Sequence, residues 1–153
     1  MITVIQRVFS ASVTADGNPS GSIGRGLYLL LGVGRDDTEE DARVLCEKIS
    51  KLRIFTDEND KMNLSVNDIG GSALVVSNFT LYANYAHGNR PDYLNGAPAA
   101  EANRLYEYFK ACLKERIPVV ESGVFGADMR TAMETDGPVT IVMDSKILLK
   151  KGK

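Results

Sequence analysis

The chain has 153 residues, of which 44% are hydrophobic and 25% charged, and its formal net charge is −2. This size and balance predict one globular domain and exclude a disordered or low-complexity chain. The negative charge argues against a basic face for nucleic acid. No apolar run approaches the roughly 18 residues that a membrane helix needs, so we expect no membrane partner. Two cysteines form no disulfide framework, and the expected compartment is the reducing cytoplasm.

The first half of the chain predicts strands followed by one helix. Residues rich in β-branched or alternating apolar side chains predict strands over 2–8, 10–15 and 22–32. Thr38 is the expected N-cap of a helix, with Asp41 at its third position. Apolar residues then recur at three- and four-residue spacing as far as Leu52, which predicts an amphipathic helix.

The second half predicts a central strand, a helix and two further strands. The expected elements are a strand over 72–82, a polar loop over 83–96, a helix between Pro98 and Pro118, and strands over 119–126 and 139–143. This order predicts a mixed α/β fold in a single compact domain, with a largely antiparallel, barrel-like sheet and two packed helices. We expect the domain to span residues 1–145 and residues 146–153 to form a basic tail.

Familiar catalytic and cofactor motifs are missing from the sequence. The only histidine, His87, lies in the polar loop and rules out a two-histidine metal site. The segment Gly32-Val33-Gly34-Arg35 lacks the third glycine of a dinucleotide-binding loop. Cys46 and Cys112 lie on predicted helices, where a packing role is more usual than nucleophilic chemistry. We therefore expect neither a metal nor a cofactor.

Two polar segments stand out against this background. Ser77-Asn78-Phe79-Thr80 ends an apolar run, and buried polar groups there must bond within the sheet or face a ligand. Asp136-Gly137-Pro138-Val139-Thr140 brings a Gly-Pro step to the start of a strand. That step is either an ordinary turn or a cis bond, which X–Pro sequences tolerate. The sequence pattern alone does not decide between sheet bonding and a ligand contact for the first segment, or between a turn and a cis bond for the second.

Together these segments resemble the D-aminoacyl-tRNA deacylase family, of the D-tyrosyl-tRNA deacylase type. The family carries Ser-Gln-Phe-Thr-Leu-Tyr-Ala where this chain has residues 77–83, and Asn-x-Gly-Pro-Val-Thr where it has residues 135–140. Further matches follow in order at residues 4–8, 52–55, 61–65, 90–91 and 125–129. The resemblance covers residues 1 to about 145, which makes it far more specific than any one motif.

The resemblance implies hydrolysis of the ester that joins a D-amino acid, or glycine, to the 3′-terminal adenosine of tRNA. It implies a homodimer in which Gly137-Pro138 of one subunit enters the partner's active site and a cis bond there excludes L side chains. The implied catalytic residues are Ser77, Asn78, Phe79 and Thr80, with the main-chain N–H groups of Phe79 and Thr80 stabilising an oxyanion. The implied substrate-binding residues are Arg7, Phe125, Met129, Gly137, Pro138, Val139 and Thr140, with Arg7 bracing the Gly-Pro motif and Phe125 and Met129 bordering adenine.

Several alternatives remain beside this interpretation. The Thr80 hydroxyl could act as a nucleophile, although no base is visible to activate it. Asn78 and Thr135 depart from the Gln and Asn of the family. These departures are compatible with a related deacylase that acts on mischarged L-alanyl-tRNA through a trans Gly-Pro motif. They are also compatible with a non-catalytic tRNA-binding dimer. A small-molecule enzyme is a weaker alternative because no cofactor motif is present. The lysine-rich tail is a hypothetical tRNA contact.

Overall fold

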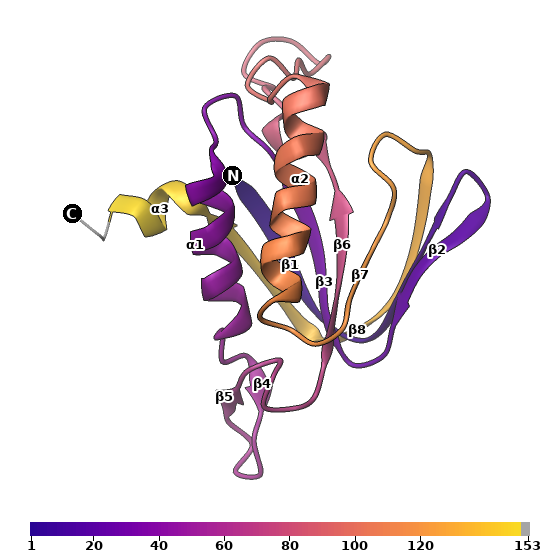
Figure 1. The fold of residues 1–153 in the computed structure, drawn as a ribbon, viewed down its shortest axis with the longest axis vertical. Coiled ribbons are helices and arrows are strands. Elements are labelled where there is room, and N and C mark those ends of the chain that lie inside the picture. Colours follow the sequence, from indigo (N-terminus) through magenta and orange to yellow (C-terminus); the bar gives the residue numbers. More distant parts are fainter. Residues whose placement is uncertain (151–153) are drawn as a thin grey trace.

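One mixed sheet forms the centre of the fold. A computed structural model of the chain describes residues 1–150 (Figure 1). The strands of this sheet are β1 (Ile2–Ala15), β2 (Asn18–Ile23), β3 (Gly26–Gly32), β6 (Ser72–Ser77), β7 (Val120–Ser122) and β8 (Met129–Asp144). β1 pairs antiparallel with β2, β3 and β8, whereas β3, β6 and β7 run parallel to one another. A small separate hairpin consists of β4 (Phe55–Thr56) and β5 (Met62–Leu64). The predicted mixed α/β class is confirmed.

The sheet curls until its two ends lie close together. The strand path runs from β2 through β1, β3 and β6 to β7. Ser20 in β2 donates from its hydroxyl to the carbonyl of Ser122 in β7 at 2.9 Å. The backbones are so near that a Cβ added at Gly21 would lie 3.1 Å from the same carbonyl oxygen. The predicted barrel-like sheet is therefore confirmed.

Helices cover one face of the sheet. α1 (Glu39–Ser50) and α2 (Ala99–Lys114) lie side by side across it, and α3 (Ser145–Lys150) lies beside α1 (Figure 1). Thr38 is the N-cap of α1 as predicted, and the Asp41 carboxylate accepts its N–H at 2.8 Å. α3 adds a third helix to the two that the sequence predicts. No helix within residues 1–150 is long and apolar enough to cross a membrane.

Two apolar clusters occupy the two faces of the sheet. Along β6, Val75 belongs to the cluster under the helices, whereas Leu74 and Val76 belong to the opposite cluster. This alternation explains why β6 reads as a continuous apolar run, because both of its faces are buried. The helix-side cluster includes Leu29, Leu45, Ile49, Leu105 and Phe109, and the opposite one includes Val8, Val13 and Tyr28. Each fully buried aliphatic side chain contributes about 1.5–3 kcal/mol.

The predicted strand over residues 72–82 is too long. β6 ends at Ser77, and Phe79–Tyr82 forms a 3₁₀ helix, η1. The partner strand β3 ends at Gly32, and Asn78 makes the last bond to it by donating its N–H to the Leu31 carbonyl at 2.8 Å. With no partner strand left to extend the ladder, the chain leaves the sheet and forms η1, none of whose residues is buried.

The last strands also differ from the prediction. Of residues 119–126, only Val120–Ser122 form a strand, and the strand predicted over 139–143 extends over the whole of β8. The reason is β1, which offers a partner along its full length, from Ile2 opposite Asp144 to Ala15 opposite Met129. The Gly137–Pro138 step, for which an ordinary turn was one alternative, lies inside β8 at an irregularity of register and is cis.

The start of the basic tail is ordered against the domain. Residues 145–150 form α3, and Lys151 and Lys153 lie outside the described residues. The Lys146 ammonium group pairs with the carboxylates of Asp37 at 3.1 Å and Asp41 at 2.7 Å. These internal partners give Lys146 a role within the domain, so the predicted tRNA contact of the tail rests on its remaining lysines.

Candidate functional site

A cavity of about 460 Å³ opens where β3 and β6 end. Because these two strands are parallel, their carboxyl ends lie at the same edge of the sheet. The wall is completed by η1, the loop before α2, the first residues of α2 and the β7–β8 connection. The lining residues are Leu31, Val33, Ser77, Asn78, Phe79, Tyr93, Gly96, Ala97, Ala99, Ala102, Phe125, Gly126, Ala127 and Met129. An apolar cavity with few polar groups is typical of a small-ligand site.

Five of the predicted site residues meet in this cavity. Ser77, Asn78 and Phe79 form one side of it, and Phe125 and Met129 form another. The Phe79 ring is 60% exposed and meets the Tyr93 ring edge to face, with 4.9 Å between the ring centroids. The structure thus brings the first polar segment together with residues some 50 positions away in sequence. Their catalytic and binding roles stay predictions.

Thr80 lies beside the cavity rather than in its wall. Its hydroxyl donates to the side-chain carbonyl of Asn78 at 2.5 Å. The backbone bonds of η1 begin only at Leu81, whose N–H donates to the Asn78 carbonyl at 3.4 Å. Because the first N–H groups of a helical turn have no partner inside it, the amides of Phe79 and Thr80 are available to a ligand.

The cavity offers little acid–base chemistry of its own. Among the described residues that line it, none carries a carboxylate, an imidazole, an amine or a thiol. Within residues 1–150, no three His, Cys, Asp or Glu side chains are placed to hold one metal ion. His87 is exposed in its loop. The arrangement can therefore enclose a small ligand and donate main-chain hydrogen bonds to it, while its described lining supplies no ionisable group of these kinds.

The other predicted residues form a separate group around Arg7. Its guanidinium group donates to the Asp136 carbonyl at 3.2 Å and pairs with the Asp136 carboxylate at 3.1 Å. It also donates to the carbonyl of Ile54 at 2.7 Å. Gly137 and Pro138, which follow Asp136, are exposed, and Val139 and Thr140 continue β8. Within one chain, none of these residues lines the cavity.

Some lining residues escaped sequence reasoning. Leu31 and Val33 belong to a buried stretch that predicts core packing, and nothing in their pattern marks the end of the strand as a cavity floor. Tyr93 is one of two tyrosines in the polar loop, and the sequence pattern does not distinguish it from Tyr85, which is exposed and does not line the cavity. Gly96 and Ala97 carry no side-chain chemistry and could only be found from the three-dimensional structure.

Comparison with known proteins decides the family. The family model described as D-Tyr-tRNA(Tyr) deacylase matches residues 4–144. The chain belongs to this family. The match covers both the cavity motif at residues 77–83 and the Arg7–Asp136 group, so the resemblance predicted from sequence is confirmed.

Relatives of this deacylase-family chain match it over nearly their whole length. The D-aminoacyl-tRNA deacylase of Koribacter versatilis is 54% identical, and that of Caldicellulosiruptor bescii 51%, each over 95% of this chain and 98% of the relative. The solved structure of a c-Myc DNA Unwinding Element Binding Protein superposes with a TM-score of 0.88 at 39% identity, covering 94% of this chain and 98% of that one.

Proposed function

We propose that this protein hydrolyses the ester bond of D-aminoacyl-tRNA, and of glycyl-tRNA, at the 3′-terminal adenosine. The observation that carries the proposal is the family match over residues 4–144, together with relatives named for this activity at more than half identity. We place the reaction in the cytoplasm, where aminoacyl-tRNA is made and used.

The cavity suits a reaction that needs no general base. An aminoacyl ester is already activated, and the neighbouring ribose hydroxyl can assist the attack of water. The protein then has to hold the ester and stabilise the oxyanion that develops on its carbonyl oxygen. We assign this role to the amides of Phe79 and Thr80, which have no backbone partner within η1, and each such donor contributes about 3 kcal/mol. Phe125 and Met129 supply apolar surface against which adenine can pack.

Discrimination against L-amino acids is proposed to come from a second copy of the chain. Gly137 and Pro138 are exposed and do not line the cavity of their own protomer. Arg7 pairs with Asp136, the residue that precedes them, at 3.1 Å and so fixes the start of the segment. In a homodimer this segment of one protomer enters the cavity of its partner. Its main-chain carbonyls face the α-amino group of the substrate, and the backbone leaves no space for an L side chain. Val139 and Thr140 flank the segment and complete the wall.

The direct test uses purified protein with D-tyrosyl-tRNA, L-tyrosyl-tRNA and L-alanyl-tRNA. We expect the D ester to be cleaved and both L esters to be spared, with heat-denatured protein as the control. Equal cleavage of L-tyrosyl-tRNA would refute chiral selection, and preferential cleavage of L-alanyl-tRNA would favour the related L-alanine deacylase. Binding of tRNA without turnover would show a non-catalytic dimer.

Three variants separate the elements of the mechanism. Thr80→Ala keeps the main-chain amide, so its activity should fall less than about tenfold, whereas a loss near 10⁴-fold, about 5.5 kcal/mol, would restore the nucleophile mechanism.

For the shared site, Ala127→Trp fills the cavity and Gly137→Ala distorts the inserted segment. Each variant alone should lose at least about tenfold in activity, and mixed dimers should regain part of the loss. Failure to regain any activity would argue against insertion into the partner.

A further inference from the structure

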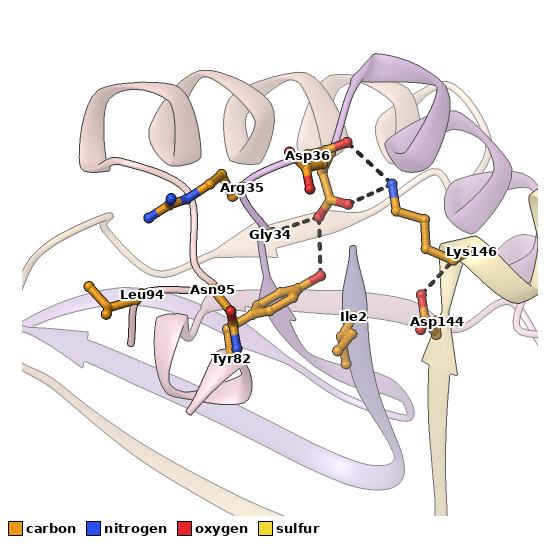
Figure 2. Close-up of a pocket in the computed structure, with 10 residues that line it drawn as sticks. Ile2, Gly34, Arg35, Asp36, Tyr82, Leu94, Asn95, Asp144 and Lys146 are labelled. Atoms are coloured by element: carbon orange, nitrogen blue, oxygen red, sulfur yellow. Dashed lines mark hydrogen bonds and ion pairs between the residues drawn. The ribbon is translucent and has the colours of Figure 1, made fainter. Parts of the chain in front are cut away.

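A second, polar cavity lies at the other end of η1 from the candidate site. It measures about 310 Å³ and is lined by Gly34, Arg35, Asp36, Asp37, Tyr82, Asn95 and Lys146, among others. Figure 2 shows the Tyr82 side chain pointing from η1 toward the Gly34–Asp36 loop, while Lys146 reaches the same loop from the side of α3. η1 thus connects two cavities, with Asn78 and Phe79 at one and Tyr82 at the other.

Two glycines allow Tyr82 to lie directly on the end of β3. A Cβ added at Gly34 would stand 2.7 Å from the Tyr82 hydroxyl, and one added at Gly32 would stand 2.9 Å from the Cβ of Leu81. Neither distance is compatible with an ordinary side chain. The last two residues of η1 are therefore packed onto the strand end as closely as a polypeptide backbone permits.

The Tyr82 hydroxyl is held by a carboxylate that is itself fixed from several sides. Tyr82 donates to Asp37 Oδ2 at 3.2 Å, and the Gly34 N–H donates to the same oxygen at 2.6 Å. The Met1 amino group at 2.6 Å and the Lys146 ammonium group at 3.1 Å bind Asp37 Oδ1. The Asp37 side chain is 2% exposed. Burial and the nearby Asp37 charge raise the pKa of Tyr82, so its hydroxyl keeps its proton and donates.

The opposite half of η1 is held less closely: Asn78 donates its N–H to the Leu31 carbonyl at 2.8 Å, and the Phe79 ring meets the Tyr93 ring edge to face. Phe79 is nevertheless 60% exposed, Thr80 is exposed, and within residues 1–150 the Thr80 hydroxyl bonds only to its near neighbour Asn78. A turn of four residues is too short to be rigid by its own hydrogen bonds. The position of the Phe79 and Thr80 amides therefore depends on both ends of η1, and Tyr82 belongs to the more firmly anchored one.

We propose that Tyr82 is a positioning residue for the reaction: bound by Asp37, it fixes η1 and so keeps the Phe79 and Thr80 amides in the position that the proposed function requires. The inference rests on the proposed function, in which these amides face the developing oxyanion. Donors of this kind act only when they are already in place, and a misplacement near 1 Å can reduce turnover about 10²-fold.

Tyr82→Phe tests this role with the smallest possible change, because the ring stays on the two glycines and only the bond to Asp37 is lost. We expect kcat for D-tyrosyl-tRNA to fall about tenfold while KM changes less than about twofold, since substrate contacts are intact. Amide hydrogen exchange at Phe79 and Thr80, followed by NMR, should accelerate. The matched control is Tyr28→Phe, which removes another buried hydroxyl from the cluster on the opposite face of the sheet and should change neither kcat nor exchange.

Three outcomes would overturn the proposal. Unchanged kcat and exchange in Tyr82→Phe would show that the hydroxyl does not hold the turn. A raised KM with unchanged kcat would make Tyr82 a binding residue instead. An equal loss in Tyr28→Phe would indicate general destabilisation. Amide exchange is measured without substrate. The absence of turnover in the wild-type protein would refute the proposed function, whereas unchanged exchange in Tyr82→Phe would separately refute the positioning of η1 by Tyr82.

Discussion

Replacing Arg7 with Met should weaken the fold where it supports the Gly137–Pro138 segment. The Arg7 side chain is 8% exposed, and its guanidinium group connects β1 to Ile54 and to Asp136. Methionine preserves an unbranched apolar stem and removes every donor. The Ile54 carbonyl then loses a 2.7 Å bond, and the Asp136 carboxylate loses its counter-charge.

The size of the effect follows from burial. Removing one partner of a buried ion pair destabilises a protein by about 3–5 kcal/mol, because the remaining charge is left uncompensated. The Asp136 side chain is 17% exposed, so water can reach it and we expect the lower end, about 3 kcal/mol. Asp136→Asn leaves Arg7 with its carbonyl partners and should lose about 1–2 kcal/mol. The double variant should lose less than the sum of the two, because neither partner then leaves the other unpaired.

The assay is urea unfolding followed by circular dichroism at one fixed protein concentration, since association of protomers would make the apparent stability depend on concentration. Arg53→Met is the matched control, because Arg53 is exposed and bonds only to Asn63 nearby. It should change stability by no more than about 0.5 kcal/mol. A loss below about 1 kcal/mol in Arg7→Met, or strict additivity in the double variant, would refute this reasoning.

Three further predictions concern single residues. Burial acts to raise the pKa of Asp41, but hydrogen bonds from Lys146, Ser145 and the Thr38 N–H lower it to about 2. The resulting stabilisation, about 2 kcal/mol, is present above the unfolded-state pKa of about 3.9 and is lost as the pH falls toward 2. Asp41→Asn should flatten that decline in urea unfolding, and an unchanged decline would contradict the assignment. Gly137 has φ of +132°, and a Cβ there would lie 2.7 Å from the Val139 nitrogen. Gly137→Ala should therefore reduce the proposed deacylase activity at least about tenfold, whereas Gly24→Ala, with nothing within 4 Å of its Cβ, should retain it. Burial raises the pKa of the Cys46 thiol, so we expect no reaction with Ellman's reagent until urea unfolds the chain.

Sequence patterns predict which helices and strands form better than they predict where each one ends. Thr38 begins its helix as predicted, because capping depends on neighbours within one turn. The apolar run predicts a strand as far as Tyr82, because such a run does not show where the partner strand ends. Asp37 and Asp41 belong to an acidic segment at the start of a helix, which predicts side chains exposed to solvent. Both are buried, because Lys146 and the Met1 amino group reach them from distant parts of the chain.

The candidate site shows the same division. Ser77 and Asn78 stand out locally as polar residues after an apolar run, so the sequence alone marks them. Phe125 and Met129 have no local signal, and only the family resemblance indicates them, because their approach to Asn78 depends on the course of the chain between β7 and β8. The separation between the cavity and Gly137 could not be predicted from spacing, since it depends on the register of β8 against β1.

The pairing of β1 with β8 also has a consequence for how the chain is made. The two strands lie near opposite ends of the sequence, so their ladder gives the fold a high contact order and predicts folding in milliseconds to seconds rather than microseconds. During synthesis β1 leaves the ribosome first and β8 follows on the order of ten seconds later, at about 5–20 residues per second. Until then one side of the nascent β1 has no partner, and an unpaired strand edge invites pairing with other chains. The chain is therefore most prone to aggregation before its last strand has emerged.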